Sequence, residues 1–512
     1  MRISVPSPVA STALQAAFQA TSPRHQEIHT PWRSALIHGG VLLAWGLLTL
    51  MALHQGALWA WSVGVAYVLY DTSLLVFTTL STWHLVSTPA AGAEPATSTP
   101  NDNPVDGTAP ALTIGVIVAA HNEASVLPAT LAALMAQKRL PDLVLIADDG
   151  STDATATLLT QEYGLAPLAL TGDAHAGLPP GRLHWLQLPR GGKARALNAA
   201  LPLLTADVLL TIDADTLVEP DALAAVERAF LADRRLVAAS GVLRPVCADD
   251  WQGRVLAWFQ TYEYLRNYLS RHAWARADGL LLISGAFAAF RRQAVLEVGG
   301  FDTGCLVEDY ELIHRLRRFS ARQGLGWTTS VIGGARARTE APSTVGAFVR
   351  QRRRWFGGFL QTQYWYRDMV GEQRYGAVGT RMLPVKAIDT LQPLFGLTAL
   401  AVAFANLFAG HWQVLFPVAG VITAKIAVDL LFHLWSVHVY RRWLQLPTEG
   451  TGPHLAPALL AALAEPFTFQ ILRHVSAALG WWGFLRGRDT WGTQHRVALL
   501  QPALEPAQGH RQ

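Results

Sequence analysis

The stretch ALTIGVIVAAHNEASVLPATLAALMAQKRLPDLVLIADD, residues 111–149, decides how the middle of this chain folds. It begins and ends with runs that are apolar along their whole length, and the segment between them has the pattern of a helix. Further strand-like runs follow at 182–188 and 208–215. Strands that are apolar throughout are typical of parallel sheets covered by helices on both faces. Residues 111–345 are therefore predicted to form an α/β domain with a mostly parallel sheet.

Acidic side chains stand where two of these strands end. Asp148 and Asp149 end the second strand-like run, and Asp213 and Asp215 end the fourth. In open parallel sheets, ligands bind beyond the carboxyl ends of the strands. Two carboxylates two residues apart can hold a hard divalent cation such as Mg²⁺, which takes other ligands from phosphate and water. A solvated loop or a helix cap, with Ser151 or Thr152 capping after the first pair, explains the same residues without any chemistry.

Other polar residues fall near the same edge of the sheet. His121 and Glu123 follow the first strand, where they can face a nucleotide. Lys193, after two glycines, begins a predicted helix whose first backbone amides suit a phosphate. The chain contains neither G-x-G-x-x-G nor G-x-x-x-x-G-K-[ST], which counts against a dinucleotide site or a P-loop.

Two more motifs follow the predicted sheet. Glu308 and Asp309 precede a predicted helix, and Asp309 is the candidate carboxylate base for a weakly nucleophilic hydroxyl group. The alternative is that these acids only stabilise a helix N-terminus. Residues 351–355 read Gln-Arg-Arg-Arg-Trp and lie near an apolar segment, where arginines are by default a topology signal. The functional hypothesis is that Arg354 binds phosphate and Trp355 offers an aromatic face to a ligand.

The rest of the sequence is unusually apolar. Of the 512 residues, 51% are hydrophobic and only 15% charged, whereas soluble domains carry about 25% charged residues. Apolar runs that approach membrane-spanning length lie at 35–53, 57–80, 391–410 and 412–435. A weaker run at 455–484 is expected to span, re-enter or lie on the membrane surface.

Charge and cysteines fit a membrane protein. The net charge of +4 could suit nucleic acid, but the arginines cluster beside apolar segments, so cytoplasmic loops are expected and no nucleic-acid partner. Arg441 and Arg442 mark one such loop. Cys247 and Cys305 are expected to be free thiols in a reducing compartment.

These patterns divide the chain into seven segments. The predicted segments are a polar tail (1–33), two transmembrane helices (34–84), a flexible linker (85–110), the α/β domain (111–345), a segment with the arginine motif and interfacial helices (346–385), a C-terminal transmembrane region (386–484) and a polar tail (485–512). No signal peptide is predicted, because the first 30 residues contain no continuous apolar run.

Each motif alone is ambiguous, but the four motifs in this order and spacing are not. From about 111 to 360 the chain resembles processive glycosyltransferases of family two, which include cellulose, chitin, hyaluronan and bacterial poly-N-acetylglucosamine synthases. Those enzymes carry an acidic motif, Asp-x-Asp, a Glu-Asp or Thr-Asp pair and Gln-x-x-Arg-Trp between transmembrane helices. The resemblance implies a GT-A fold inserted between membrane helices, in the bacterial inner membrane, with a cytoplasmic catalytic domain. The ending 485–492 also resembles the tails of bacterial relatives.

The resemblance implies a UDP-sugar donor, Mg²⁺ or Mn²⁺, and one inverting displacement in which Asp309 takes the proton of the acceptor hydroxyl. Val307 stands where these enzymes often have Thr, and the sequence around Gly285 lacks a Cys often found near the acceptor. The candidate residues are, for catalysis, Asp309 and Glu308; for the metal, Asp213 and Asp215; and for the substrates, His121, Glu123, Asp148, Asp149, Lys193, Gly285, Gln351, Arg354 and Trp355.

The product stays open at this point. By resemblance, UDP-N-acetylglucosamine is the favoured donor, UDP-glucose is close behind, and the product is a β-linked polysaccharide that is exported. Lys386, Asp389, Lys425 and Asp429 lie in or near the C-terminal apolar runs, and we expect some of them to line the exit path, although Lys425 and Asp429 can also form a simple pair within one helix.

The expected partners are the donor, a glycan or lipid acceptor and membrane lipid, and a small accessory membrane subunit of unknown identity stays open. One alternative is an enzyme that adds a single sugar to a lipid or polyprenol. Another is an inactive membrane scaffold that binds a nucleotide sugar.

Overall fold

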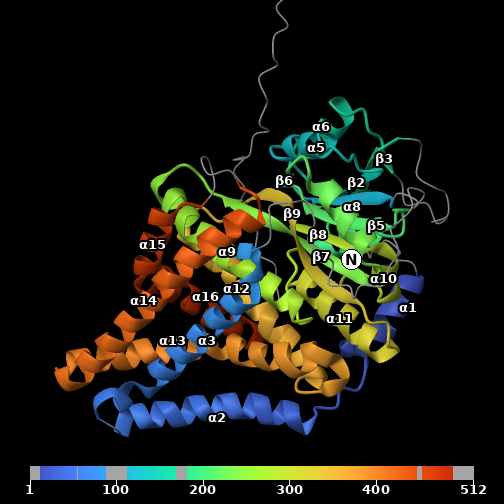
Figure 1. Cartoon of the computed structure of the whole chain (residues 1–512). Coiled ribbons are helices and arrows are strands. Elements are labelled where there is room, and N and C mark those ends of the chain that lie inside the picture. The colour runs from blue at the N-terminus through green and yellow to red at the C-terminus, as the bar shows by residue number, and fades with distance from the viewer. Residues whose placement is uncertain (1–11, 55, 88–111, 169–180, 447–452, 488–512) are drawn as a thin grey trace, which may run out of the picture.

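The structure is a computed structural model, and it describes residues 12–54, 56–87, 112–168, 181–446 and 453–487. Most of the predicted linker and of the C-terminal tail therefore lies outside the described residues. In Figure 1, the strands gather in one domain, and long helices from both ends of the chain lie beside it.

The central domain contains a nine-stranded sheet with the order β3-β4-β2-β1-β5-β8-β7-β9-β6. Strands β1, β2, β4 and β5 pair in parallel, whereas β8 is antiparallel to both β5 and β7. The predicted mostly parallel α/β sheet is confirmed. The strands are β1 (Ile114–Ala120), β2 (Leu143–Asp149), β3 (Pro167–Leu168), β4 (Leu183–Leu188), β5 (Val208–Asp213), β6 (Thr216–Val218), β7 (Leu236–Val246), β8 (Phe287–Arg291) and β9 (Thr328–Glu340).

The strand register brings the acidic motifs to one edge. Strand β1 lies between β2 and β5, with Ala120 opposite Asp148 and Ala119 opposite Asp213. The three strands are buried at almost every position because helices cover the sheet. The helices of this domain are α5 (Leu127–Met135), α6 (Thr155–Gln161), α7 (Lys193–Ala200), α8 (Ala222–Ala232), α9 (Trp251–Arg276), α10 (Arg292–Glu297), α11 (Glu308–Gln323) and α12 (Val345–Trp365).

Part of the predicted N-terminal tail is ordered against the central domain. Helix α1 (Thr12–Thr21) packs on α10, with Leu14 buried. The hydroxyl group of Thr21 donates to the Val298 carbonyl over 2.8 Å, and Arg24 forms an ion pair of 2.6 Å with Asp302. This helix was not predicted from the sequence, because it is short and packs on α10, which is distant in the sequence.

Within the part of the chain that the structure describes, four helices are long and apolar enough to cross a membrane, which marks the chain as a membrane protein. They are α2 (Trp32–His54), α3 (Ser62–Thr82, extended by the preceding turn), α13 (Leu383–Phe408) and α14 (Trp412–Trp443). The short helix α4 (His84–Ser87) follows α3. The last apolar run forms α15 (Leu455–Ala464) and α16 (Phe469–Leu485), in a pair bent by 49° that corresponds to a broken span or a re-entrant loop.

Helices α12 and α16 cross at two glycines. A Cβ atom on Gly480 would lie 2.5 Å from the carbonyl oxygen of Arg353, and one on Gly357 would lie 3.2 Å from the carbonyl oxygen of Gly480. The absence of side chains therefore permits backbone contact between the helix with the arginine motif and the bent C-terminal pair.

We expect Gly480→Ala to destabilise the protein by about 1–3 kcal/mol, because the added methyl group collides with backbone that cannot rotate away. The matched control is Gly420→Ala on α14, where a Cβ atom meets nothing within 4 Å. Thermal unfolding of the detergent-solubilised variants measures the difference. Equal melting temperatures for the two variants would contradict the close crossing.

Candidate active site

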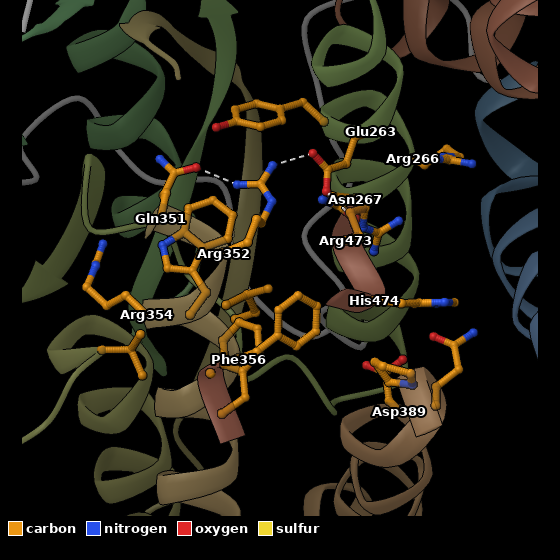
Figure 2. A pocket seen from close by; sticks show the side chains of 18 of the residues that line it. Glu263, Arg266, Asn267, Gln351, Arg352, Arg354, Phe356, Asp389, Arg473 and His474 are labelled. Carbon is orange, nitrogen blue, oxygen red and sulfur yellow. Dashed lines mark hydrogen bonds and ion pairs between the residues drawn. The ribbon is translucent and has the colours of Figure 1, made fainter. Parts of the chain in front are cut away.

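One cavity of about 1400 Å³ extends from the carboxyl edge of the sheet into the long helices. Figure 2 shows a part of its wall, where side chains of α12 face those of α9. All but one of the residues predicted for the site line this cavity. They are His121, Glu123, Asp149, Lys193, Asp213, Asp215, Gly285, Glu308, Asp309, Gln351, Arg354 and Trp355.

Asp148 is the exception. Its carboxylate is fully buried and accepts bonds from the Ser151 amide (2.9 Å) and from the indole N–H of Trp185 (3.4 Å). The side chain points into the sheet domain because neighbouring residues of a strand face opposite sides. Asp148 therefore does not line the cavity in this structure, and its carboxylate shapes the loop after β2 instead.

Asp149 faces the cavity and holds in place the loop of residues 190–192, which precedes α7. Its carboxylate accepts the backbone N–H groups of Gly191 (2.6 Å) and Gly192 (2.8 Å) and forms an ion pair with Arg190 (3.2 Å). Gly192 has φ of +95°, a conformation that favours glycine. This loop leads directly into α7, whose first residue is Lys193.

The loops after β1 and β2 are joined to each other. His121 bonds through Nδ1 to the Asp149 carbonyl (2.9 Å), and the Asn122 side chain accepts the Thr152 amide (2.7 Å). Neither Ser151 nor Thr152 caps α6, because Asp153 bonds the Thr155 amide instead (3.0 Å). The capping interpretation of Ser151 and Thr152 is therefore wrong.

Lys193 connects the Asp-x-Asp motif to the Glu-Asp pair. Its ammonium group lies 2.5 Å from Asp213, 3.8 Å from Glu308 and 3.3 Å from the Gly285 carbonyl oxygen. Burial opposes the lysine charge, but Asp213 and Glu308 outweigh burial and raise the pKa of Lys193 above its ordinary value. Burial, with Asp309 adjacent, raises the pKa of Glu308, although Lys193 partly offsets the shift. The Lys193 ammonium group therefore lies among the carboxyl groups of Asp213, Glu308 and Asp309.

Asp213 and Asp215 can supply two carboxylate ligands to a divalent metal that is also bound by a phosphate group. Both line the cavity at the end of β5, and Asp215 is only 7% exposed. Among the described residues, no group of three or more His, Cys, Asp or Glu side chains could hold a metal. Two carboxylates suffice for Mg²⁺ when phosphate oxygens and water complete its six ligands.

Asp309 is held in one orientation by backbone groups. Its Oδ2 atom accepts the Gly285 amide (2.6 Å), and its Oδ1 atom accepts the amide of Tyr310 (2.9 Å). A Cβ atom on residue 285 would lie 2.8 Å from Oδ2, so glycine is needed there. Asp309 is half-buried at the cavity, whereas Glu308 is almost fully buried. Of the two acids, Asp309 is the one that a substrate can reach.

The arginine motif lies on α12 and faces the same cavity. Arg354 donates to the Leu306 carbonyl (2.9 Å), two residues before Glu308. The guanidinium group of Arg352 lies over the Trp355 ring at 4.2 Å and bonds Gln351 at 2.5 Å. The helical spacing of Gln351, Arg354 and Trp355 thus brings all three to the cavity wall.

Sequence reasoning missed several charged residues of the cavity. Glu263 on α9 is buried and binds Arg352, and Asp71 on α3 lies 2.8 Å from Lys425. The signal for Asp71 was its acidic side chain within a predicted membrane helix. No comparable signal marked Glu263, because the apolar and polar residues of α9 are not separated onto different faces of the helix.

The predicted exit-path residues line the membrane end of the cavity. Lys386 pairs with Asp389 (2.5 Å), and Lys425 pairs with Asp429 as well as with Asp71. The intrahelical pair of Lys425 and Asp429 is therefore present, but it is part of a link between α14 and α3.

The fold and the site define a class of protein. A mostly parallel sheet with carboxylates and a lysine at its carboxyl edge is the framework of a GT-A glycosyltransferase domain. Residues 110–358 match the family described as glycosyltransferase like family 2. This region of the chain is a family-two glycosyltransferase domain, as the sequence motifs indicated.

Two curated relatives extend the comparison. The poly-beta-1,6-N-acetyl-D-glucosamine synthase of Staphylococcus aureus is 29% identical over 247 residues, which are 48% of this chain and 54% of that protein. The protein of the same name from Staphylococcus epidermidis is 25% identical over 251 residues, with the same two shares of 48% and 54%. The chain spans about half the length of the curated relatives it matches.

Two solved structures are also similar. A mannosyltransferase from Pyrobaculum calidifontis, in complex with GDP-Man and Mn²⁺, has a TM-score of 0.48 and 21% identity over 80% of this chain and 99% of that chain. Glucosyl-3-phosphoglycerate synthase from Mycobacterium tuberculosis, in complex with Mn²⁺, UDP and glucosyl-3-phosphoglycerate, has a TM-score of 0.31 and 17% identity over 49% of this chain and 80% of that chain.

We expect Asp309→Asn to reduce sugar transfer by about 10²–10⁴-fold, because the amide cannot accept the hydroxyl proton. Binding of the nucleotide-sugar donor should persist, since Asn keeps the shape and one of the two carbonyl-type oxygens. Transfer is measured by release of the nucleoside diphosphate and binding by isothermal titration. Full transfer by a variant that still binds donor would exclude Asp309 as the base.

Removal of divalent metal with EDTA should abolish sugar transfer, and Mg²⁺ or Mn²⁺ should restore it. Asp213→Asn should lower the rate by about 10²-fold or more at saturating metal, because half of the predicted protein ligands are lost. The matched control is Asp221→Asn, the same change at an exposed carboxylate near the start of α8. An EDTA-resistant rate would contradict the metal site.

Proposed function

We propose that this protein is a membrane glycosyltransferase that adds sugars from a UDP-sugar to a growing β-linked polysaccharide, with inversion at the anomeric carbon. The observation that carries the proposal is the continuity of the cavity. Its sheet end contains Lys193, Asp213 and Asp309, and its other end contains Lys425 and Asp429 of a helix long enough to cross a membrane. A product made at the sheet edge thus has a continuous space that leads into the membrane helices.

In the proposed reaction, Asp309 accepts the proton of the acceptor hydroxyl while that oxygen attacks the anomeric carbon. The bond to the diphosphate breaks on the opposite face, and UDP leaves with the bonding electrons. Lys193 and Arg354 bind the diphosphate and stabilise its developing charge. A divalent ion on Asp213 and Asp215, when bound, supplies further charge neutralisation. The two backbone N–H bonds to Asp309 fix its direction, so little reorganisation is needed as the proton moves.

The lining of the membrane end supports a hydrophilic product. Ion pairs such as Lys386–Asp389 and Lys425–Asp71 offer hydrogen-bonding groups where bare lipid-facing helices would be apolar. The names of the curated relatives favour N-acetylglucosamine as the sugar. The basic residues at the end of α14 favour a cytoplasmic position for the catalytic domain, in a bacterial inner membrane.

The test is to incubate membranes containing the protein with a panel of UDP-sugars and Mg²⁺ or Mn²⁺. We expect UDP-N-acetylglucosamine to give the fastest UDP release and a polymer that a β-linkage-specific hexosaminidase degrades. The Asp309→Asn protein in the same membranes is the control. A single small lipid-soluble product would instead identify a transferase that adds one sugar, and an absence of UDP release with every donor would leave only a scaffold.

A further inference from the structure

Four side chains from three helices form a continuous chain along the cavity wall. Arg473 of α16 lies 3.3 Å from Glu263 of α9, and Glu263 binds Arg352 of α12 through its other carboxylate oxygen. Arg352 donates in turn to the side-chain oxygen of Gln351 at 2.5 Å. Figure 2 shows this chain crossing the space between α9 and α12, with Arg473 beside Glu263.

Arg352 is fixed more completely than its neighbours in the arginine motif. Its side chain is 1% exposed, one terminal nitrogen binds Glu263 and the other binds Gln351. The guanidinium plane also lies over the rings of Phe348 (4.5 Å) and Trp355 (4.2 Å). Arginine alone among the side chains supplies two forked donors and a flat stacking surface at once.

This fixation has two consequences for Gln351 and Trp355. One face of the Trp355 ring is covered by Arg352, so a ligand can stack only on the other face. The carbonyl oxygen of Gln351 accepts from Arg352, so its NH₂ group is the part that can donate to a ligand in the cavity. Both groups are thereby given a single orientation.

We propose that Glu263 and Arg473 are positioning residues for the acceptor: through Arg352 they fix the Gln351 amide and the open face of Trp355 against the terminal sugar of the growing chain. The inference rests on the proposed transferase function and deepens it. The groups that it invokes act on the acceptor and not on the donor, whose diphosphate is assigned to Lys193 and Arg354.

The energetics favour a role in orientation over one in stability. Buried ion pairs contribute little compared with apolar side chains of the same volume, because both charges must leave water. Glu263 is 4% exposed and lies within ion-pair distance of two arginines, Arg352 and Arg473. The chain of side chains instead fixes orientation, because α9 and α16 each supply one member and α12 supplies Arg352 and Gln351.

The test compares Glu263→Gln with the wild-type protein, using UDP-N-acetylglucosamine and a short β-linked N-acetylglucosamine oligosaccharide as added acceptor. We expect the KM for the acceptor to rise about tenfold or more, because Arg352 loses its anchor and the contacts of Gln351 weaken. The KM for the donor, and the hydrolysis of donor without acceptor, should stay within about twofold of wild type. Arg352→Lys should behave like Glu263→Gln, whereas Arg473→Lys, which keeps the charge beside Glu263, should retain the wild-type KM.

The matched control is Asp368→Asn, which removes a carboxylate from the buried Arg318 (2.8 Å) outside the cavity. It should lower thermal stability as much as Glu263→Gln but leave the acceptor KM unchanged. An unchanged acceptor KM in Glu263→Gln, or equal increases for donor and acceptor, would overturn the positioning role. If the wild-type protein turned over no UDP-sugar, the proposed function itself would fail, and this outcome is distinct from the other two.

Discussion

The catalytic end of the cavity depends on the ammonium group of Lys193. Asp213, Glu308 and Asp309 are brought together at the sheet edge, and three carboxylates at such close range repel one another. The lysine contacts two of them and the carbonyl of Gly285, whose amide holds the third. Its position follows from the loop that Asp149 stabilises. A single cation thus joins the ends of strand β5, the loop before β8 and the start of α11.

Cations also lie beside carboxylates along the part of the cavity between the membrane helices, but the balance of charge differs from that near the sheet. Near the sheet, the excess of carboxylates suits a divalent metal, and Lys193 and Arg354 suit a diphosphate. Deeper in the cavity, cations and anions alternate in pairs, as in Arg266 with Glu465 and Lys425 with Asp71. Paired charges offer polar groups to the cavity but attract ions of either sign only weakly, because the fields of the two charges cancel at short range. Such a lining suits an uncharged, hydroxyl-rich chain better than an anionic one.

The strand pattern and the motifs made much of this predictable. The apolar runs that contain β1, β2 and β5 were evident because strands buried on both faces leave a continuous hydrophobic signal. The placement of Asp213 and Lys193 followed from strand and helix ends. The orientation of Asp148 could not be read, since which of two adjacent aspartates faces the cavity depends on the pleat of one strand. Glu263 escaped notice because its partners, Arg352 and Arg473, are 89 and 210 residues away in sequence (352 − 263 and 473 − 263), and only folding brings them together.

The contact of Gly357 with Gly480 limits how the chain can be recombined. Two residues after Trp355, the backbone of α12 touches the backbone of a helix that follows more than a hundred residues later. A catalytic domain exchanged with that of a relative would bring its own version of α12 to a foreign α16. Unless both helices had small residues at the positions of Gly357 and Gly480, the two helices would move apart and the ring of Trp355 would be displaced. Helices α12 and α16 are therefore structurally coupled, and functional chimaeras should exchange them together.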